Sequence, residues 1–255
     1  MNNSILKIIA CVFITLNFKL ETRNCAAQQP PQYTQYVFNN YMINPAVGGI
    51  RDYMDIKIGY RIQWLGIFGT PPKTMFASVS APIKLFQEPQ EYKKKYHGIG
   101  GSVSQDVTGP ISGLTAKASY SYHKRLSREL CASAGIAGGV MQYRLNAGGL
   151  VAAPPDDPDM YDPDVRSISA ITPDIQAGVW AYSDIFFAGF SVEQILPLNL
   201  SGTRTRLTHH YFFTGGYRYK YTPFLSFIPS AHLKFGLLTP ATFDISLNVD
   251  YRNKY

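Results

Sequence analysis

Residues 54–64 alternate strictly between apolar and polar side chains. The apolar positions are Met54, Ile56, Ile58, Tyr60, Ile62 and Trp64. Successive side chains of a β-strand point to opposite faces, so this two-residue period predicts a strand with one apolar and one polar face. The period alone does not say which face meets water. A soluble sandwich buries its apolar faces together, whereas a membrane barrel turns them toward lipid.

The same period recurs along the rest of the chain and predicts ten strands. They span residues 54–64, 74–81, 98–105, 114–123, 130–143, 174–182, 185–193, 210–221, 230–238 and 243–251. Beyond residue 27 no uncharged apolar run reaches about 18 residues, so no membrane-spanning helix is predicted.

Three features favour the membrane barrel over the sandwich. Most of the strands approach the length of about nine to eleven residues that a tilted membrane strand needs. Charged residues make up only 16% of the chain, against about 25% in ordinary soluble domains. Aromatic residues gather at strand ends, as in the interfacial belts of membrane proteins. They are Trp64, Tyr120, Tyr122, Tyr143, Tyr217, Tyr219, Tyr221 and Tyr251.

We therefore expect an all-β fold, a transmembrane antiparallel up-and-down β-barrel. Its apolar faces meet lipid, while Asp55, Lys57 and Arg61 face the interior. If the first strand runs outward from the periplasm, the long loop 144–173 lies outside and the turn at Ser183 and Asp184 lies inside. Under the same orientation the long connection 82–97 is an exception, because it falls on the periplasmic side.

The N-terminus has the features of an export signal. Lys7 lies in an apolar run over residues 5–18 that is too short for a membrane-spanning helix, and Cys25 to Ala27 supply small residues for cleavage. The predicted organisation is a signal peptide (1–27), a periplasmic or luminal segment (28–51) and the barrel (52–255). A lipoprotein signal is disfavoured because the residues before Cys25 do not form a lipobox. Cleavage leaves Cys131 as the single cysteine, so no internal disulfide is expected.

Two blocks carry a family resemblance: QYTQYVFNNYMINPAVGG (32–49) and RIQWLGIFGTPPKT (61–74). Together with residues 173–197 and 243–255, they resemble the PorP/SprF family of type IX secretion membrane proteins. The positions that carry the motif are Asn44, Pro45, Ala46, Arg61, Gln63, Trp64 and Gly66.

The resemblance implies an outer-membrane barrel of Bacteroidetes-type bacteria that serves protein secretion and gliding motility. It also implies partners: components of the type IX translocon and secreted surface proteins, bound through the cargo's C-terminal domain. The segment around Asn44 and Pro45 is also similar to one in fatty-acid-transporter-type barrels, where the N-terminus enters the lumen. Family members usually continue further, so ten strands suggest an incomplete barrel of fourteen.

Catalytic chemistry is not expected from the five histidines. His209 and His210 are adjacent and should point to opposite faces of a strand. His123 lies near Ser121 with no third group in the sequence pattern to orient it. No nucleophile elbow or zinc-helix motif is present. We expect a protein that is not an enzyme and has no cofactor or metal.

Two predicted outer loops carry charge. Five acids lie in residues 154–164, namely Asp156, Asp157, Asp159, Asp162 and Asp164. They lack EF-hand spacing, so we interpret them as a solvated loop or a partner contact. Arg204 and Arg206 lie in the second loop, where they could contact the phosphates of outer-membrane lipid or solvent.

The overall charge excludes another class of partner. The formal net charge is +7, but basic residues are not interleaved with aromatics over a long span, so nucleic acid is not an expected partner. The leading hypothesis is a non-enzymatic barrel that binds, anchors or hands over secreted surface proteins. The alternative is a transport barrel for hydrophobic or small solutes.

Overall fold

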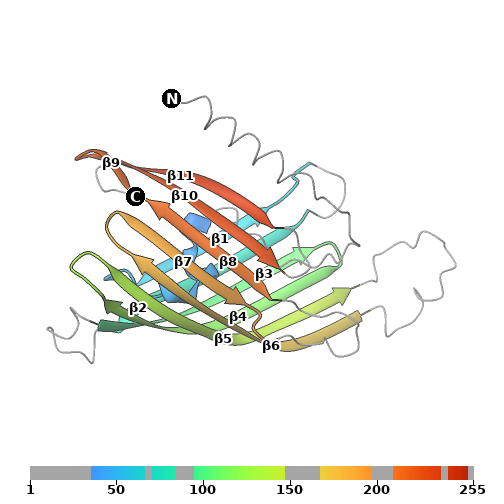
Figure 1. Ribbon diagram of the computed structural model, residues 1–255. Helices are drawn as coiled ribbons and strands as arrows, with labels where there is room; N and C mark the ends of the chain where they lie inside the picture. Colours follow the sequence, from blue (N-terminus) through green and yellow to red (C-terminus); the bar gives the residue numbers. More distant parts are fainter. Residues whose placement is uncertain are drawn as a thin grey trace.

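The computed structural model describes residues 36–66, 71–83, 95–146, 167–196, 209–236 and 241–251. Almost all of these belong to one curled antiparallel sheet (Figure 1). Its strands are β1 (Asp55–Ile62), β2 (Lys73–Ile83), β3 (Lys95–Thr108), β4 (Ile111–Arg125), β5 (Cys131–Asn146), β6 (Ser167–Tyr182), β7 (Phe186–Glu193), β8 (His210–Tyr217), β9 (Tyr219–Thr222), β10 (Leu225–Gly236) and β11 (Thr242–Tyr251). Among the described residues, no helix is long and apolar enough to span a membrane.

The order of the strands in the sheet follows the sequence, except that β8 pairs with β10 and not with β9, and this confirms the predicted up-and-down order. Several strands are longer than predicted, because they continue beyond the clear alternating pattern. β5 continues to Asn146 and β6 begins at Ser167, and Asn146 pairs with Ser167. The predicted loop 144–173 is therefore wrong at both ends, since residues 144–146 and 167–173 belong to the β5–β6 ladder.

The strand predicted over residues 210–221 is broken at Arg218. The backbone N–H of Arg218 donates to the carbonyl of Ile185 at 2.7 Å, directly after the last β7–β8 pair, Phe186 with Tyr217. β8 and β9 both pair with β10, so together they fill one position in the sheet. This explains why ten strands were predicted and eleven are observed. β10 also begins earlier than predicted, at Leu225 instead of Ser230.

The two faces of the sheet have the reverse polarity of a soluble protein. Ile58 is 82% exposed and Ile56 is 64% exposed, and Leu114 and Leu247 also point outward. The buried side chains of the strands are mostly polar: Thr74, Ser78, Ser80, Ser121, His123, Ser133, Thr172, Asp174, Gln176, Ser191, His210, Thr214, Ser226, Ser230, His232, Lys234 and Asp250. This confirms that the apolar face is the outer face, as a membrane barrel requires.

Aromatic residues gather along one edge of the sheet. Tyr122, Tyr217 and Tyr251 lie where β4, β8 and β11 end, and all three are exposed on the outer face. Because the strands alternate in direction, these ends share one edge. Trp64 lies beyond the end of β1, at the opposite edge.

The sheet is curled but not closed. β1 and β11 are its two edge strands, and in the part of the chain that the structure describes they do not pair with each other. The described strands form a curved antiparallel wall with lipid-type and polar faces, which is consistent with the expected β-barrel. An edge strand in hydrocarbon needs a partner for its backbone groups.

Neighbouring residues of β11 provide a test of the two faces. Ile245 points outward and Ser246 inward. Ile245→Lys places a charge in lipid and should lower the free energy of unfolding by about 2–4 kcal/mol, whereas Ser246→Lys should cost much less. Urea unfolding in lipid vesicles measures both. An equal cost for the two variants would contradict the assigned faces.

Candidate functional site: the inner face and the segment it holds

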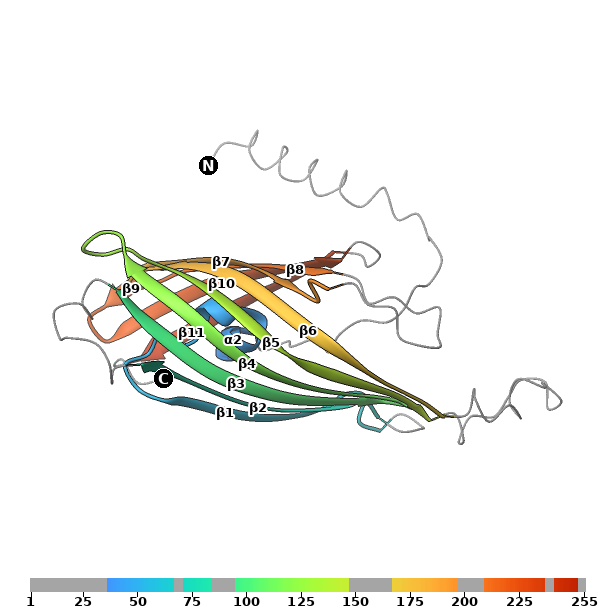
Figure 2. The ribbon, with the colours of Figure 1, turned by 90° about the horizontal axis from the view of Figure 1, so that it is seen from below.

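Residues 36–50, here called the inner segment, lie inside the curve of the sheet (Figure 2). They form three short helical turns, η1 (Tyr36–Phe38), α2 (Asn40–Ile43) and η2 (Pro45–Val47). Asn44 caps η2, because its side-chain oxygen accepts a hydrogen bond from the N–H of Ala46 at 3.0 Å. Pro45 suits the first position of such a turn because its φ is already fixed.

The sheet binds the backbone of the inner segment through polar side chains. Four carbonyls of the segment, those of Met42, Ile43, Ala46 and Gly48, accept hydrogen bonds from β4, β5, β6 and β7. The bonds run from Ser121 and His123 to Gly48 (2.6 and 2.7 Å), from Ser133 to Ala46 (2.7 Å), from Ser191 and Gln176 to Ile43 (2.7 and 2.5 Å), and from Gln176 to Met42 (3.3 Å). Irregular backbone at membrane depth is tolerated only when protein satisfies it in this way.

Asn44 makes the reciprocal contact from the segment to the sheet. Its amide nitrogen donates to the carbonyls of Val179 at 3.0 Å and Phe190 at 3.2 Å, on β6 and β7. With its cap to Ala46, this side chain, which is 2% exposed, makes three hydrogen bonds. Asn44 therefore connects the segment to two adjacent strands.

Glycines on the inner face make room for the segment. A Cβ added to Gly135 would lie 2.4 Å from the backbone nitrogen of Ala46, and one added to Gly178 would lie 2.2 Å from Oδ1 of Asn44. Both distances are far below van der Waals contact. Gly98 and Gly100 on β3 are similarly close to the segment. Glycine weakens a strand, but at these positions it is required because the backbone of the inner segment lies so close to the sheet.

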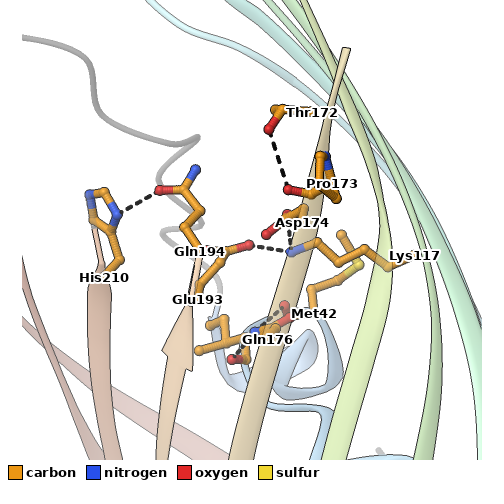
Figure 3. Close-up of polar contacts among 10 residues, drawn as sticks. Met42, Lys117, Thr172, Pro173, Asp174, Gln176, Glu193, Gln194 and His210 are labelled. Carbon is orange, nitrogen blue, oxygen red and sulfur yellow. Dashed lines mark hydrogen bonds and ion pairs between the residues drawn. The ribbon is translucent and has the colours of Figure 1, made fainter. Parts of the chain in front are cut away.

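A buried ionic group lies beside the inner segment (Figure 3). Nζ of Lys117 on β4 lies 2.8 Å from Oδ2 of Asp174 and 2.5 Å from Oε1 of Glu193, on β6 and β7. Lys117 and Asp174 are almost fully buried. Lys117 pairs with both carboxylates, so its loss leaves two buried carboxylates without their cation, whereas loss of one carboxylate still leaves an ion pair.

Next to the ionic group, Gln194 at the end of β7 binds two histidines at the start of β8. Gln194 follows Glu193 with a positive φ of 58°, a conformation that non-glycine residues rarely adopt. Its side-chain oxygen lies 3.1 Å from Nδ1 of His210, and its backbone carbonyl accepts from Nδ1 of His209 at 2.8 Å. The adjacent histidines thus reach the same residue, one at its side chain and one at its backbone.

His123 has the third group that the sequence did not predict. Its Nε2 donates to Gly48, so Nδ1 accepts from the hydroxyl of Tyr182 at 3.2 Å. The Tyr182 hydroxyl lies 2.6 Å from that of Tyr96, whose ring stacks on His123 at 4.4 Å. The expectation that nothing orients His123 is therefore wrong. The ring is positioned to hold a carbonyl of the inner segment.

The two blocks of the sequence motif lie in different places. Asn44, Pro45 and Ala46 are in the inner segment, whereas Arg61 is on β1 opposite Thr74. After β1, Gln63 donates its N–H to the carbonyl of Pro72 at 3.0 Å. Two further motif residues, Trp64 and Gly66, have positive φ values of 57° and 92°.

The other predicted contact residues cannot be placed. Asp156, Asp157, Asp159, Asp162, Asp164, Arg204 and Arg206 lie outside the described residues. Sequence analysis missed Lys117, Asp174, Gln176 and Glu193 as a group. Each lies at an inward position of its strand, but nothing in the local pattern indicates which strands supply the partners. Over the described ranges, no group of three His, Cys, Asp or Glu residues could hold a metal ion.

A curved antiparallel sheet with an apolar outer face and a hydrogen-bonded polar interior defines a membrane protein that crosses the bilayer with strands. The family model for the type IX secretion system membrane protein PorP/SprF matches residues 25–255. The chain therefore belongs to this family and is a membrane component associated with type IX secretion. No match is found among the curated proteins.

Removal of the Asn44 side chain tests its role in holding the segment. Asn44→Ala loses two hydrogen bonds to the sheet and the cap of η2, which should lower the free energy of unfolding in lipid by about 1–3 kcal/mol. Asn40→Ala is the matched control, because the side-chain oxygen of Asn40 is buried without a hydrogen-bond partner. If both variants unfold at the same urea concentration, Asn44 does not anchor the segment.

Lys117→Met tests the ionic group. It leaves Asp174 and Glu193 buried together and should destabilise the protein by about 3–5 kcal/mol. Adding Asp174→Asn and Glu193→Gln to the same chain should recover most of that loss in the same unfolding assay. Lys57→Met removes a more exposed pair with Asp55 and should cost at most about 1 kcal/mol. A triple variant no more stable than Lys117→Met would exclude charge burial as the cause.

Proposed function

We propose that this protein is an outer-membrane β-barrel of the type IX secretion and gliding machinery, which binds, anchors or hands over secreted cell-surface proteins. Family membership supports the association with secretion. The export signal predicted at residues 1–27 and the lipid-type outer face support the outer membrane as its location. The proposed mechanism is binding of a folded domain of the cargo and involves no covalent chemistry.

The observation that carries this proposal is the fixed inner segment. Side chains from four strands hold its carbonyls, and Asn44 holds it in return. A segment anchored in this way occupies the interior and leaves the loops as the surface for a large partner. In the proposed orientation, with β1 running outward, the loops after β5 and β7 face the exterior.

The sequences of those two loops suit partner recognition. Five aspartates lie between β5 and β6, and Arg204 and Arg206 lie between β7 and β8. Charged groups at an exposed rim contribute to specificity and to association rate. We propose these residues as the contacts for the cargo's C-terminal domain and for lipid phosphates.

The transport alternative has less support. A path for hydrophobic solutes needs an apolar lining, but the inner face of the described strands is polar and contains the group of Lys117, Asp174 and Glu193. A path for polar solutes needs the inner segment to move. Reconstituted protein in a planar bilayer should therefore show little conductance.

Cargo capture in cells tests the proposal. Crosslinking followed by purification of the full-length protein should recover a secreted surface protein together with translocon components. Replacement of the five loop aspartates by asparagine should reduce this recovery severalfold. The matched control changes Arg128 and Glu129 in the exposed β4–β5 turn, at the opposite edge of the sheet. Recovery of no secreted protein, with solute conductance by the reconstituted protein, would favour transport.

A further inference from the structure

The outer face carries an apolar groove of about 620 Å³ that crosses β1 to β5. Its rim includes Ile56 and Ile58 on β1, Val103 on β3 and Val140 on β5, and its lining is almost entirely aliphatic or backbone. These side chains belong to the exposed apolar face that the membrane assignment rests on. The groove is therefore a depression in the lipid-facing surface.

The strand register shows how the depression forms. Val79 pairs with Gly101, Gly101 pairs with Ala118, and Ala118 pairs with Gly138. Three small residues thus lie side by side across β3, β4 and β5. Two residues further along these strands is a second row of outward-facing residues. Val103 pairs with Ala116, and Ala116 pairs with Val140. A trough with a floor of glycine and alanine runs beside a row with two valines.

The two floor glycines are not required by the protein's own packing. A Cβ added to Gly138 would have no neighbour within 4 Å, and one added to Gly101 would meet only the carbonyl of Lys117 at 3.6 Å, an ordinary contact. Gly135 and Gly178, in contrast, are needed to admit the inner segment. Glycine in a strand interior costs about 0.5–1 kcal/mol relative to alanine, and it often marks a site where another molecule approaches closely.

The chemistry of the groove restricts what can occupy it. The backbone groups of its central strands are paired in the ladders of β2, β3, β4 and β5, and the rim side chains are hydrocarbon. An occupant with unpaired polar groups would lose their hydration without compensation. Five strands at a spacing of about 4.8 Å give a trough of about 19 Å across the strands, and because membrane strands tilt by about 35–45° this trough runs obliquely to the bilayer normal.

We propose that this groove is a binding site for the acyl chain of a membrane lipid, held across the small residues of β3, β4 and β5. The proposal rests on the membrane location of the outer face and goes beyond the binding of cargo. A resident lipid here would fill the depression that Gly101 and Gly138 leave open. It would differ from the general lipid annulus by staying bound after detergent extraction.

A photoactivatable fatty acid incorporated into reconstituted vesicles tests the site on the wild-type protein. After irradiation, peptide mass spectrometry should find labelling concentrated on the peptides that contain Gly101, Ala118 and Gly138. Labelling spread evenly over outward residues of all strands would overturn the proposal. Crosslinks from the same residues to a transmembrane segment of another protein would also overturn it.

Native mass spectrometry of detergent-purified variants gives an independent test. Gly138→Val fills the trough and should reduce the lipid-bound fraction severalfold. Ala134→Val is the matched control, because it adds bulk to the same face of β5 outside the groove. Equal retention in both variants, or no retained lipid in the wild type, would overturn the proposal.

Both variants should fold, as judged by their heat-dependent shift in gel mobility, and should recover cargo as the wild type does. Cargo recovery is measured separately, so failure of the lipid site and failure of the proposed function give different results. Gly101→Ala provides a smaller change for the case in which Gly138→Val does not fold. It should weaken lipid retention by less than a valine would, and unchanged retention would count against the site.

Discussion

The structure depends on one requirement, that backbone polar groups removed from water must find partners within the protein. Along the sheet the ladders supply those partners from β1 to β11. The inner segment has only short helical turns, so side chains of the sheet satisfy its carbonyls instead. Serine and glutamine side chains on the strands thus donate the hydrogen bonds that water would donate to the carbonyls of a surface loop. The polar inner face follows from this requirement.

Glycine has a different role on each face of this sheet. On the inner face it admits the backbone of the inner segment, and on the outer face it leaves a hollow where the protein places nothing of its own. The same β5 strand contains both cases, Gly135 and Gly138, three residues apart. A two-residue period makes such independent use of the faces possible, because each residue belongs to only one of them.

The sequence predicts the strands and their faces well because orientation along a strand is a local property. Alternation places Ile56 and Ile245 outward without knowledge of any partner. The break at Arg218 was missed because it lies inside one alternating run and has no local signal. The full lengths of β5 and β6 were missed because their paired ends continue through residues of weak pattern. The ionic group could not be predicted, since Lys117 and Glu193 are 76 residues apart. Motif similarity identified Asn44 but not its hydrogen bonds.

The position of the inner segment in the chain has a consequence for assembly. It precedes every strand that binds it, and Asn44 reaches Phe190, 146 residues later. Its contacts are complete only once β10 has joined the sheet, because the hydroxyl of Tyr36 lies 3.1 Å from Oγ of Ser230 on β10. Contacts of such long sequence separation form late and slowly. An assembly intermediate that lacks the later strands therefore leaves carbonyls of the inner segment without their hydrogen-bond partners and open to proteolysis.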